Sequence, residues 1–475
     1  MTDAQPFTPT ELATREWFFC GIGGSGMLPL ALILRGIGAT VAGSDRSRDQ
    51  GRTPEKFAWL ESLGFQLFAQ DGSGISSADQ VLIASAAVEE TVPEMVRAKA
   101  LGCARMSRAQ LLSALFNAAP QGIAVGGTSG KSTVTGMIGW ILTEAGRDPT
   151  IMNGAVMKNF VADDAPFASA RVGGGGIFVS EVDESDGSIA LYNPAVAVLN
   201  NVSLDHKSLE ELRELFGDFL ARSGTAVVNA DDAESMALIG RAKAAITFGF
   251  GADAQISVEL GSISEGPTSI SARIADRRSG DVHPLTLQVP GRHNLTNALA
   301  ALAAADAAGL ALEDAVRHLG TFAGLARRFD IVGTSASGVT VIDDFGHNPE
   351  KVAATLATLK AHPGRVIAFF QPHGFGPLRQ MGHELAEVLA TRLGPDDMTI
   401  LCDPVYFGGT VDRSVGSERI VGMIREHGGK AEHIAARADC ADRIVALAQE
   451  GDRVVVMGAR DDTLSLFARD ILHRV

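Results

Sequence analysis

Seven consecutive residues in the first third of the chain have the types that bind a polyphosphate. They follow an apolar run at residues 122–127 and read Gly127, Thr128, Ser129, Gly130, Lys131, Ser132 and Thr133. Between a strand and a helix, successive backbone N–H groups can hold the β- and γ-phosphates of ATP, a lysine can neutralise them, and a hydroxyl can reach Mg²⁺. The strict Walker spacing is not met, because Val125 stands where its first glycine belongs. A turn without a ligand is the alternative, but packing alone does not explain glycine, lysine and serine in this order.

An acidic segment and a histidine follow the next apolar runs. Glu181, Asp183, Glu184 and Asp186 lie at the end of one run, and His206 lies beyond the end of the next. A loop that holds ATP phosphates needs Mg²⁺, which prefers hard carboxylate oxygens and takes few protein ligands. A divalent cation is therefore one interpretation of this segment. A solvated acidic loop, with His206 as a hydrogen-bonding residue of the fold, is the other.

A second glycine-rich turn lies near the N-terminus. Gly21, Gly23, Gly24, Ser25 and Gly26 form a GxGxxG pattern after an apolar run and before a helical pattern that starts near Met27. Such a turn lets backbone N–H groups approach a diphosphate, and Asp45 stands where an acid that contacts a ribose would end the second strand. The alternative is a tight turn with no ligand. Because hydride transfer needs no Walker lysine, two such loops in one chain argue against a dehydrogenase.

Composition limits the class of protein that carries these loops. The chain has 475 residues, enough for about three domains. Hydrophobic residues make up 46% and charged residues 20%, which is typical of globular proteins, and the net charge of −15 argues against a binder of nucleic-acid backbones. The four cysteines are far apart, and the sequence pattern indicates neither export nor a membrane span. We expect a cytoplasmic protein without membrane insertion.

Short apolar runs alternate with helix-period segments, which predicts an α/β fold with parallel sheets covered by helices. One segment, residues 256–289, instead alternates with period 2 and indicates a small antiparallel insert. The Ala-rich residues 298–312 predict a packed helix. The buried strands that we expect are 17–22, 81–86, 122–127, 176–181, 196–201, 366–371 and 453–458.

Motifs along the whole chain, from about Phe18 to the C-terminus, occur in an order that resembles the ATP-dependent Mur ligases of peptidoglycan synthesis. They read GIGGSGM, GTSGKST, EVDESD, the stretch from Asn201 to His206, PGRHNLTNALAA, RRFD, VIDDFGHNP and FFQPHG. The likeness is greatest to the alanine-adding branch of that family. As a set, these motifs are far more specific than either glycine-rich loop alone.

The resemblance implies three domains: residues 1–115 as a Rossmann-like domain for the UDP substrate, residues 116–325 as a P-loop ATPase-like domain, and residues 326–475 as a Rossmann-like domain on the amino-acid side. It implies an enzyme that uses ATP and Mg²⁺ to join the lactyl carboxylate of UDP-N-acetylmuramate to an amino acid, with L-alanine favoured. No nucleic-acid partner is expected, and the oligomeric state is left open. Domain closure over the reactants is also implied.

The same resemblance implies a role for each matching residue. Catalysis would rest on Lys131, Glu181, His206 and Arg328, and Mg²⁺ would be held by Ser132, Glu181 and His206. ATP would contact residues 127–133, His293, Asn294, Arg328 and Asp344. The two substrates would contact Gly21, Gly23, Gly24, Ser25, Gly26, Asp45, Ser85, His347, His373 and Arg379. Simpler explanations remain for some of these residues: Asn294 can decorate a helix, Arg328 can be solvated, and Asp344 can end a strand in a turn.

The amino-acid side departs from the family pattern, in which DDYAHHP and PHRYxR carry aromatic and arginine residues that hold the amino acid. Phe345 replaces the tyrosine, and Gly374 and Pro377 stand in place of two arginines. A lost guanidinium that pairs with a carboxylate is a substantial change, and Arg379 and Arg460 are the candidates to supply the charge from another direction. Two alternatives therefore stay open: a ligase for another amino acid or a recycled L-alanyl peptide, and a catalytically silent regulator that binds nucleotides.

Overall fold

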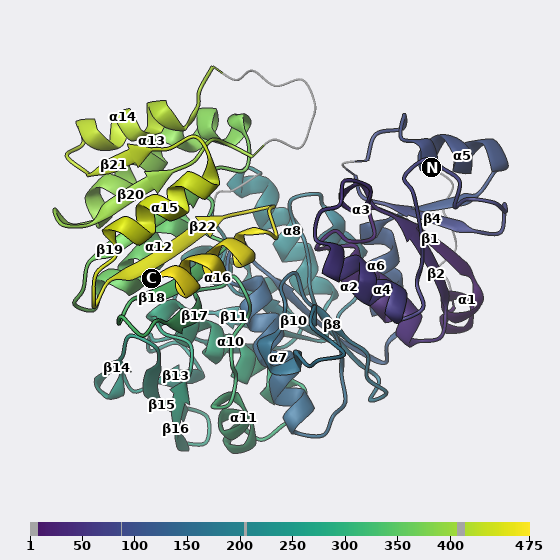
Figure 1. Ribbon diagram of the computed structural model, residues 1–475. Helices are drawn as coiled ribbons and strands as arrows, with labels where there is room; N and C mark the ends of the chain where they lie inside the picture. Colours follow the sequence, from purple (N-terminus) through teal and green to yellow (C-terminus); the bar gives the residue numbers. More distant parts are fainter. Residues whose placement is uncertain (1–7, 87, 204–206, 406–413) are drawn as a thin grey trace. The chain divides into compact units, whose positions relative to one another are not determined.

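The computed structural model describes residues 8–86, 88–203, 207–405 and 414–475. These residues form two compact units. The first contains the chain up to Ser264 together with Ser271–Leu287 and Asn294–Ala323, and the second contains Glu265–Ile270, Gln288–His293 and Gly324–Val475. The N-terminal sheet and most of the central sheet lie in the first unit, and the C-terminal sheet lies in the second. Figure 1 labels the strands of all three sheets.

The N-terminal sheet has five parallel strands within the described part of the chain, in the order β3-β2-β1-β4-β5. Side chains alternate along its central strand: Trp17 and Phe19 lie in one buried cluster, and Phe18 and Cys20 lie in another. Helices α2, α4 and α6 cover the first face and α5 covers the second, as a strand buried on both sides requires. The strands are β1 Glu16–Cys20, β2 Thr40–Ser44, β3 Gln66–Phe68, β4 Val81–Ala84 and β5 Ala104–Ser107. The helices are α1 Pro9–Thr14, α2 Leu28–Gly36, α3 Arg46–Asp49, α4 Pro54–Ser62, α5 Pro93–Leu101 and α6 Arg108–Ala118.

The central sheet contains eleven strands among the described residues, in the order β14-β15-β13-β12-β11-β10-β6-β9-β7-β8, with β16 paired to β15. The run from β13 to β7 is parallel, whereas β15 and β8 pair antiparallel with their neighbours. The antiparallel pairing of β13 with β15 confirms the insert predicted at residues 256–289. The strands are β6 Gln121–Gly126, β7 Thr150–Met152, β8 Ala170–Arg171, β9 Ile177–Glu181, β10 Val196–Leu199, β11 Thr225–Asn229, β12 Ala245–Phe248, β13 Ile256–Val258, β14 Ser264–Glu265, β15 Ile270–Asp276 and β16 Val282–Leu287.

The Ala-rich helix differs from its predicted bounds of 298–312. It is α10, which begins within the PGRHN motif and spans Arg292–Ala307. Gly309 has φ +82°, and the backbone N–H of Leu310 bonds to the carbonyl of Ala305, so a glycine in the left-handed region ends the helix. The other helices of this part are α7 Lys131–Glu144, α8 Leu209–Arg222, α9 Ala233–Leu238 and α11 Leu312–Leu319, with single 3₁₀ turns η1 Lys158–Phe160, η2 Ser188–Leu191, η3 Ile239–Arg241 and η4 Leu260–Ser262.

The C-terminal sheet has six strands in the described residues, in the order β17-β18-β22-β19-β20-β21, and all pairs are parallel except β17 with β18. Both of its faces are buried, by α12, α13 and α14 on one side and by α15 and α16 on the other. The strands are β17 Asp330–Thr334, β18 Thr340–Asp344, β19 Val366–Gln371, β20 Met398–Leu401, β21 Ala431–His433 and β22 Arg453–Gly458. The helices are α12 Pro349–Lys360, α13 Phe375–Arg392, α14 Ser417–Glu426, α15 Arg437–Leu447 and α16 Leu464–Arg474.

The structure is thus α/β with three sheets, as the sequence predicts. The two compact units do not by themselves divide the N-terminal sheet from the central one, so the boundaries at residues 115/116 and 325/326 stay a prediction. None of the helices in the described ranges has the length and hydropathy needed to cross a lipid bilayer.

Candidate active site

The predicted phosphate loop joins the end of β6 to the start of α7, which is the strand–loop–helix setting that such a loop requires. Gly127 and Gly130 have φ values of +132° and +83°, in the region that favours glycine. An added Cβ at Gly130 would lie 2.5 Å from the side chains of both Asn200 and Asn297. Only glycine fits at this position, directly before the first residue of α7.

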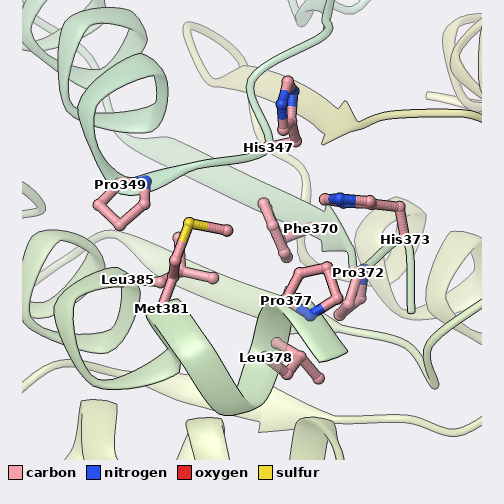
Figure 2. Close-up of a pocket in the computed structure, with 9 residues that line it drawn as sticks. All are labelled: His347, Pro349, Phe370, Pro372, His373, Pro377, Leu378, Met381 and Leu385. Carbon is pink, nitrogen blue, oxygen red and sulfur yellow. The ribbon is translucent and has the colours of Figure 1, made fainter. Parts of the chain in front are cut away.

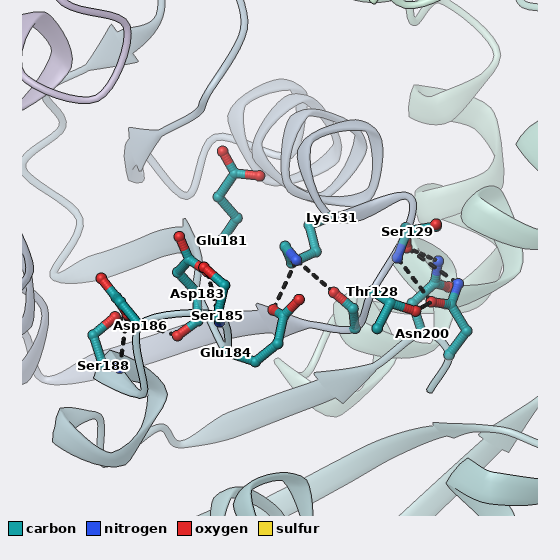
Figure 3. A network of polar contacts seen from close by, with 12 residues as sticks. Thr128, Ser129, Lys131, Glu181, Asp183, Glu184, Ser185, Asp186, Ser188 and Asn200 are labelled. Carbon is teal, nitrogen blue, oxygen red and sulfur yellow. Dashed lines mark hydrogen bonds and ion pairs between the residues drawn. The ribbon is translucent and has the colours of Figure 1, made fainter. Parts of the chain in front are cut away.

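Two asparagines at the end of β10 hold the loop in shape (Figure 3). Asn201 accepts the Ser129 backbone N–H on its Oδ1 at 2.8 Å, and its carbonyl accepts the Thr128 N–H at 3.2 Å. Asn200 donates from Nδ2 to the Ser129 carbonyl at 3.0 Å. Because β6 and β10 are parallel neighbours, their carboxyl ends share one edge of the sheet, which brings these residues together.

The same asparagines connect the loop to helix α10. Asn200 donates to Asn297 Oδ1 at 3.1 Å, and Asn297 donates to Asn294 Oδ1 at 3.4 Å. Asn294 and Asn297 are each 5% exposed. Asn294, predicted from the resemblance as an ATP contact, therefore lies in a buried polar chain that leads to the loop. Asn200 Oδ1 is a buried acceptor with no hydrogen-bond donor in the described part of the protein.

Lys131 is held by two acceptors at the mouth of the loop (Figure 3). Its Nζ donates to the Gly127 carbonyl at 2.6 Å and to Glu184 Oε2 at 2.8 Å. Glu184 is 4% exposed, so its carboxylate depends on this cation. Sequence reasoning included Glu184 in the acidic segment but gave it no role. Its pairing with Lys131 joins residues 53 positions apart, for which no local pattern exists.

Ser132 and Glu181 are in contact at the start of α7. The Ser132 hydroxyl donates to Glu181 Oε2 at 2.8 Å, and Asn153 fixes the Ser132 carbonyl at 2.9 Å. A hydroxyl and a carboxylate beside a phosphate loop are the hard oxygen ligands that Mg²⁺ prefers, so these residues fit the ion. Their third predicted partner, His206, lies outside the described residues. Within the described ranges, no group of three His, Cys, Asp or Glu side chains is arranged to hold a metal.

Arg108, the first residue of α6, contacts the acidic segment and the first glycine loop. Its guanidinium lies 3.7 Å from Asp183 Oδ2 and 3.8 Å from Asp186 Oδ2. At Gly26, an added Cβ would lie 3.0 Å from Arg108 Cδ. Burial raises the pKa of Asp183, but hydrogen bonds from Ser185 and the charges of Lys131 and Arg108 outweigh it and leave the pKa below its usual range. Sequence reasoning missed Arg108, because a basic residue at the start of a helix carries no specific signal.

The first glycine loop lies at the carboxyl edge of the N-terminal sheet, as predicted. Gly21 follows β1 with φ +82°, and Gly24 and Ser25 are exposed there. Asp45 accepts the Gly23 N–H on Oδ2 and the Ser47 N–H on Oδ1, both at 2.8 Å, so its carboxylate supports the turn from inside. Ser85 follows β4 at the same edge, half-buried. Contacts of these residues with a substrate stay a prediction.

In the second unit, Asp344 organises the loop that follows β18. Its two oxygens accept the backbone N–H groups of Phe329 and Gly346, each at 2.8 Å, and the Thr355 hydroxyl at 2.9 Å. The side chain of Arg328 stacks over the Phe345 ring, 4.3 Å from its centroid. Asp344 thus shapes the loop in the way that the simpler explanation of a strand-end turn requires, and its contact with a nucleotide stays a prediction.

Two histidines face each other at the carboxyl ends of β18 and β19. The rings of His347 and His373 are 5.2 Å apart and nearly perpendicular, and they line a small apolar pocket (Figure 2). Burial lowers the pKa of His347 to about 3 and that of His373 to about 4, helped in both by the nearby charge of Lys351. Both imidazoles are therefore neutral at neutral pH. Of the other predicted contacts, Arg379 is exposed on α13, and His293 is exposed in the first turn of α10.

Curated proteins match nearly the full length of this chain. A UDP-N-acetylmuramate–L-alanine ligase of Geobacter sulfurreducens is 33% identical over 454 residues, which cover 93% of this chain and 94% of that protein. One of Sorangium cellulosum is 34% identical, with 94% of each chain covered. The chain belongs to the Mur ligase family. Models of the Mur ligase catalytic domain, middle domain and glutamate ligase domain match residues 17–119, 125–305 and 327–460.

Solved Mur ligase structures have the same fold. The crystal structure of a UDP-N-acetylmuramate–alanine ligase from Thermotoga maritima aligns with a TM-score of 0.80 at 26% identity and covers 97% of this chain and 98% of that one. A murein peptide ligase from Psychrobacter arcticus aligns with a TM-score of 0.71 at 24% identity and supports the fold alone. In the Mur ligase described here, the first unit brings the phosphate loop, Glu181, Asn294 and Arg108 together. The second unit brings together Arg328, Asp344, His347 and His373.

Proposed function

We propose that this Mur ligase joins UDP-N-acetylmuramate to L-alanine with ATP, in the synthesis of the peptidoglycan precursor. The full-length similarity to ligases of that name carries the proposal. The Lys131 loop between β6 and α7, bordered by Glu181 and Glu184, gives it a physical basis. The first glycine loop, with Gly24 and Ser25 exposed at the carboxyl edge of the N-terminal sheet, is where a second, nucleotide-linked ligand would bind.

The reaction needs ATP because a carboxylate is a stabilised anion with a poor leaving group. The lactyl carboxylate attacks the γ-phosphate, which gives an acyl phosphate and ADP. The amine then attacks the acyl carbon through a tetrahedral intermediate that expels phosphate. Both steps concentrate negative charge, so catalysis rests on positioning and electrostatic stabilisation, and no covalent enzyme nucleophile is needed.

The residues divide this work by position. Lys131 neutralises the phosphates of ATP when they displace Glu184, and the backbone of the phosphate loop orients them. Arg328, whose guanidinium stacks on Phe345, would supply a further positive charge, as the family motif implies. Ser132 and Glu181, with His206, would hold Mg²⁺, which would screen the charge of the phosphoryl oxygens. A cytoplasmic site of action fits this reaction, because ATP and nucleotide sugars are present there.

Phosphate release with a panel of amines tests the proposal. The purified protein is mixed with UDP-N-acetylmuramate, ATP and Mg²⁺, and each amine is added in turn. Release that depends on L-alanine is the expected result. If release instead depends on another amino acid or on an L-alanyl peptide, that compound would be the amine substrate in place of L-alanine. No release with any amine would favour a silent nucleotide-binding protein instead.

A further inference from the structure

The loop after β22 contains an arginine in a backbone conformation that normally favours glycine. Arg460 has φ +60°, which costs a residue with a Cβ about 1 kcal/mol or more. The loop is held in place on both sides: Arg327 donates to the carbonyls of Gly458 at 2.7 Å and Asp461 at 3.1 Å. Gln371 and Arg437 donate to the Asp461 carboxylate at 2.9 and 3.0 Å. The fold therefore imposes this strained conformation on Arg460.

Within the described part of the chain, the fold does not use the guanidinium of Arg460. Its side chain is exposed and forms no hydrogen bond or ion pair with the residues that the structure describes. Its neighbours Arg327 and Arg437, by contrast, are committed to internal acceptors. Gln371 of β19 and Gly458 of β22 are register partners in neighbouring parallel strands, and His373 and Arg460 each follow two residues later. Both residues therefore lie at the same carboxyl edge of the sheet, where the charge of Arg460 adds to burial in lowering the pKa of His373.

The pocket below these histidines lacks a charged group of its own. Its wall is apolar, made by Phe370, Pro377, Leu378, Met381 and Leu385 beside the two imidazoles (Figure 2). The pocket is small and partly open, and its empty space of about 240 Å³ includes open solvent. Such a pocket suits a small apolar side chain, and neutral imidazoles can exchange hydrogen bonds with an amine. It offers no cation to a carboxylate.

An α-amino acid brings an amine, a carboxylate and a side chain, and removing its carboxylate from water is costly unless a cation pairs with it. We propose that Arg460 binds the α-carboxylate of the incoming amino acid, in place of the arginines that are absent at Gly374 and Pro377. The proposal rests on the ligase function proposed above. It assigns the strain at Arg460 to substrate recognition, because the loop after β22 begins at the same sheet edge as the loop after β19, which lines the pocket.

The variant Arg460→Gly separates binding from folding. Glycine adopts a positive φ without strain, so the melting temperature should stay the same or rise. KM for L-alanine should rise about 10- to 100-fold, the range expected for one lost hydrogen-bonded charge pair. L-Alaninamide lacks the carboxylate, so the wild type should use it much less efficiently than L-alanine, and Arg460→Gly should use both about equally. Arg460→Lys keeps the positive charge but loses the two-pronged guanidinium, so its preference for L-alanine should lie between those of the wild type and Arg460→Gly.

Two further arginines complete the design. Arg469, exposed on α16, is the matched control, and Arg469→Ala should keep the preference for L-alanine over L-alaninamide. Arg379→Ala tests the competing residue. The proposal is overturned if Arg460→Gly keeps the wild-type preference, if the wild type has none, or if Arg379→Ala alone loses it. If no amine supports phosphate release, the ligase function fails separately. Calorimetric titration of the wild type and of Arg460→Gly with L-alanine then tests the role of Arg460, and equal affinity of the two proteins overturns the proposal.

Discussion

At the scale of single residues, the side chains of the phosphate loop are paired with internal partners. Lys131 bonds to Glu184 and to the Gly127 carbonyl, and Ser132 bonds to Glu181. The pairing of Lys131 with Glu184 matters because a buried carboxylate is costly without a cation. Under the proposed function, the phosphates of ATP would take the place of Glu184 at Lys131, so that one anion replaces another.

We predict that Lys131→Ala abolishes ATP-dependent phosphate release, with a loss of more than about 100-fold, because the transferred phosphoryl group loses its cation. The same change leaves Glu184 buried without a partner and should cost about 1–3 kcal/mol of stability. The double variant Lys131→Ala/Glu184→Gln should recover much of that stability but none of the activity. Thermal melting and a phosphate assay measure the two effects. Turnover retained by the single variant would contradict the role of Lys131.

At the scale of elements, the site depends on how strand ends meet. The ends of β6 and β10 lie side by side, so Asn200 and Asn201 reach the phosphate loop, and α10 adds Asn297 from a distant part of the chain. Gly130, directly before α7, is enclosed by these side chains. Asn200, Asn201 and Asn297, which we call the asparagine frame, therefore pack with the start of α7 as one arrangement. A change in one of these elements should disturb the others.

We predict that Gly130→Ala removes ATP binding and destabilises the protein by clearly more than the backbone cost, because its Cβ would lie 2.5 Å from the Asn200 and Asn297 side chains. Gly146 is the matched control at the other end of α7. It also has a positive φ, but no atom lies within 4 Å of an added Cβ. Gly146→Ala should cost only about 1 kcal/mol and leave ATP binding intact. Melting curves with and without ATP compare the two, and equal losses would refute the asparagine frame.

At the scale of the whole molecule, each compact unit has its own buried cores. The core clusters around the N-terminal and central sheets lie in the first unit, and those around the C-terminal sheet lie in the second. Unfolding with more than one transition is therefore expected. The second unit also buries two neutral imidazoles, His347 and His373, which makes its stability sensitive to acid.

The sign of this effect follows from the two pKa values. An unfolded histidine takes up its proton near pH ~6.5. In the folded chain, the pKa is about 4 for His373 and about 3 for His347, so both take up their protons only at lower pH. Between these limits the unfolded state binds more protons, so stability is lost as the pH falls and regained as it rises. The double variant His347→Gln/His373→Gln should lose less melting temperature between neutral pH and about pH 5 than the wild type. An equal loss in both proteins would argue against neutral imidazoles.

Local patterns in the sequence determined much of the architecture. The strands predicted at 366–371 and 453–458 have the bounds of β19 and β22, and both glycine-rich loops lie between a strand and a helix. Short apolar runs, glycines and hydrophobic periodicity are local signals, and local backbone preferences and burial decide them. The order of the motifs was sufficient to indicate the family, which full-length relatives then confirmed.

Only the tertiary structure decided which residues meet. Glu184 pairs with Lys131; Arg108 contacts the acidic segment and lies beside Gly26; and α10 begins early enough to include Asn294. It also decided that Arg460 is strained, exposed and at the same sheet edge as His373. These contacts join residues that are tens of positions apart, and their partners depend on which strand ends share an edge. The sequence limits that choice, but packing of the whole sheet makes it.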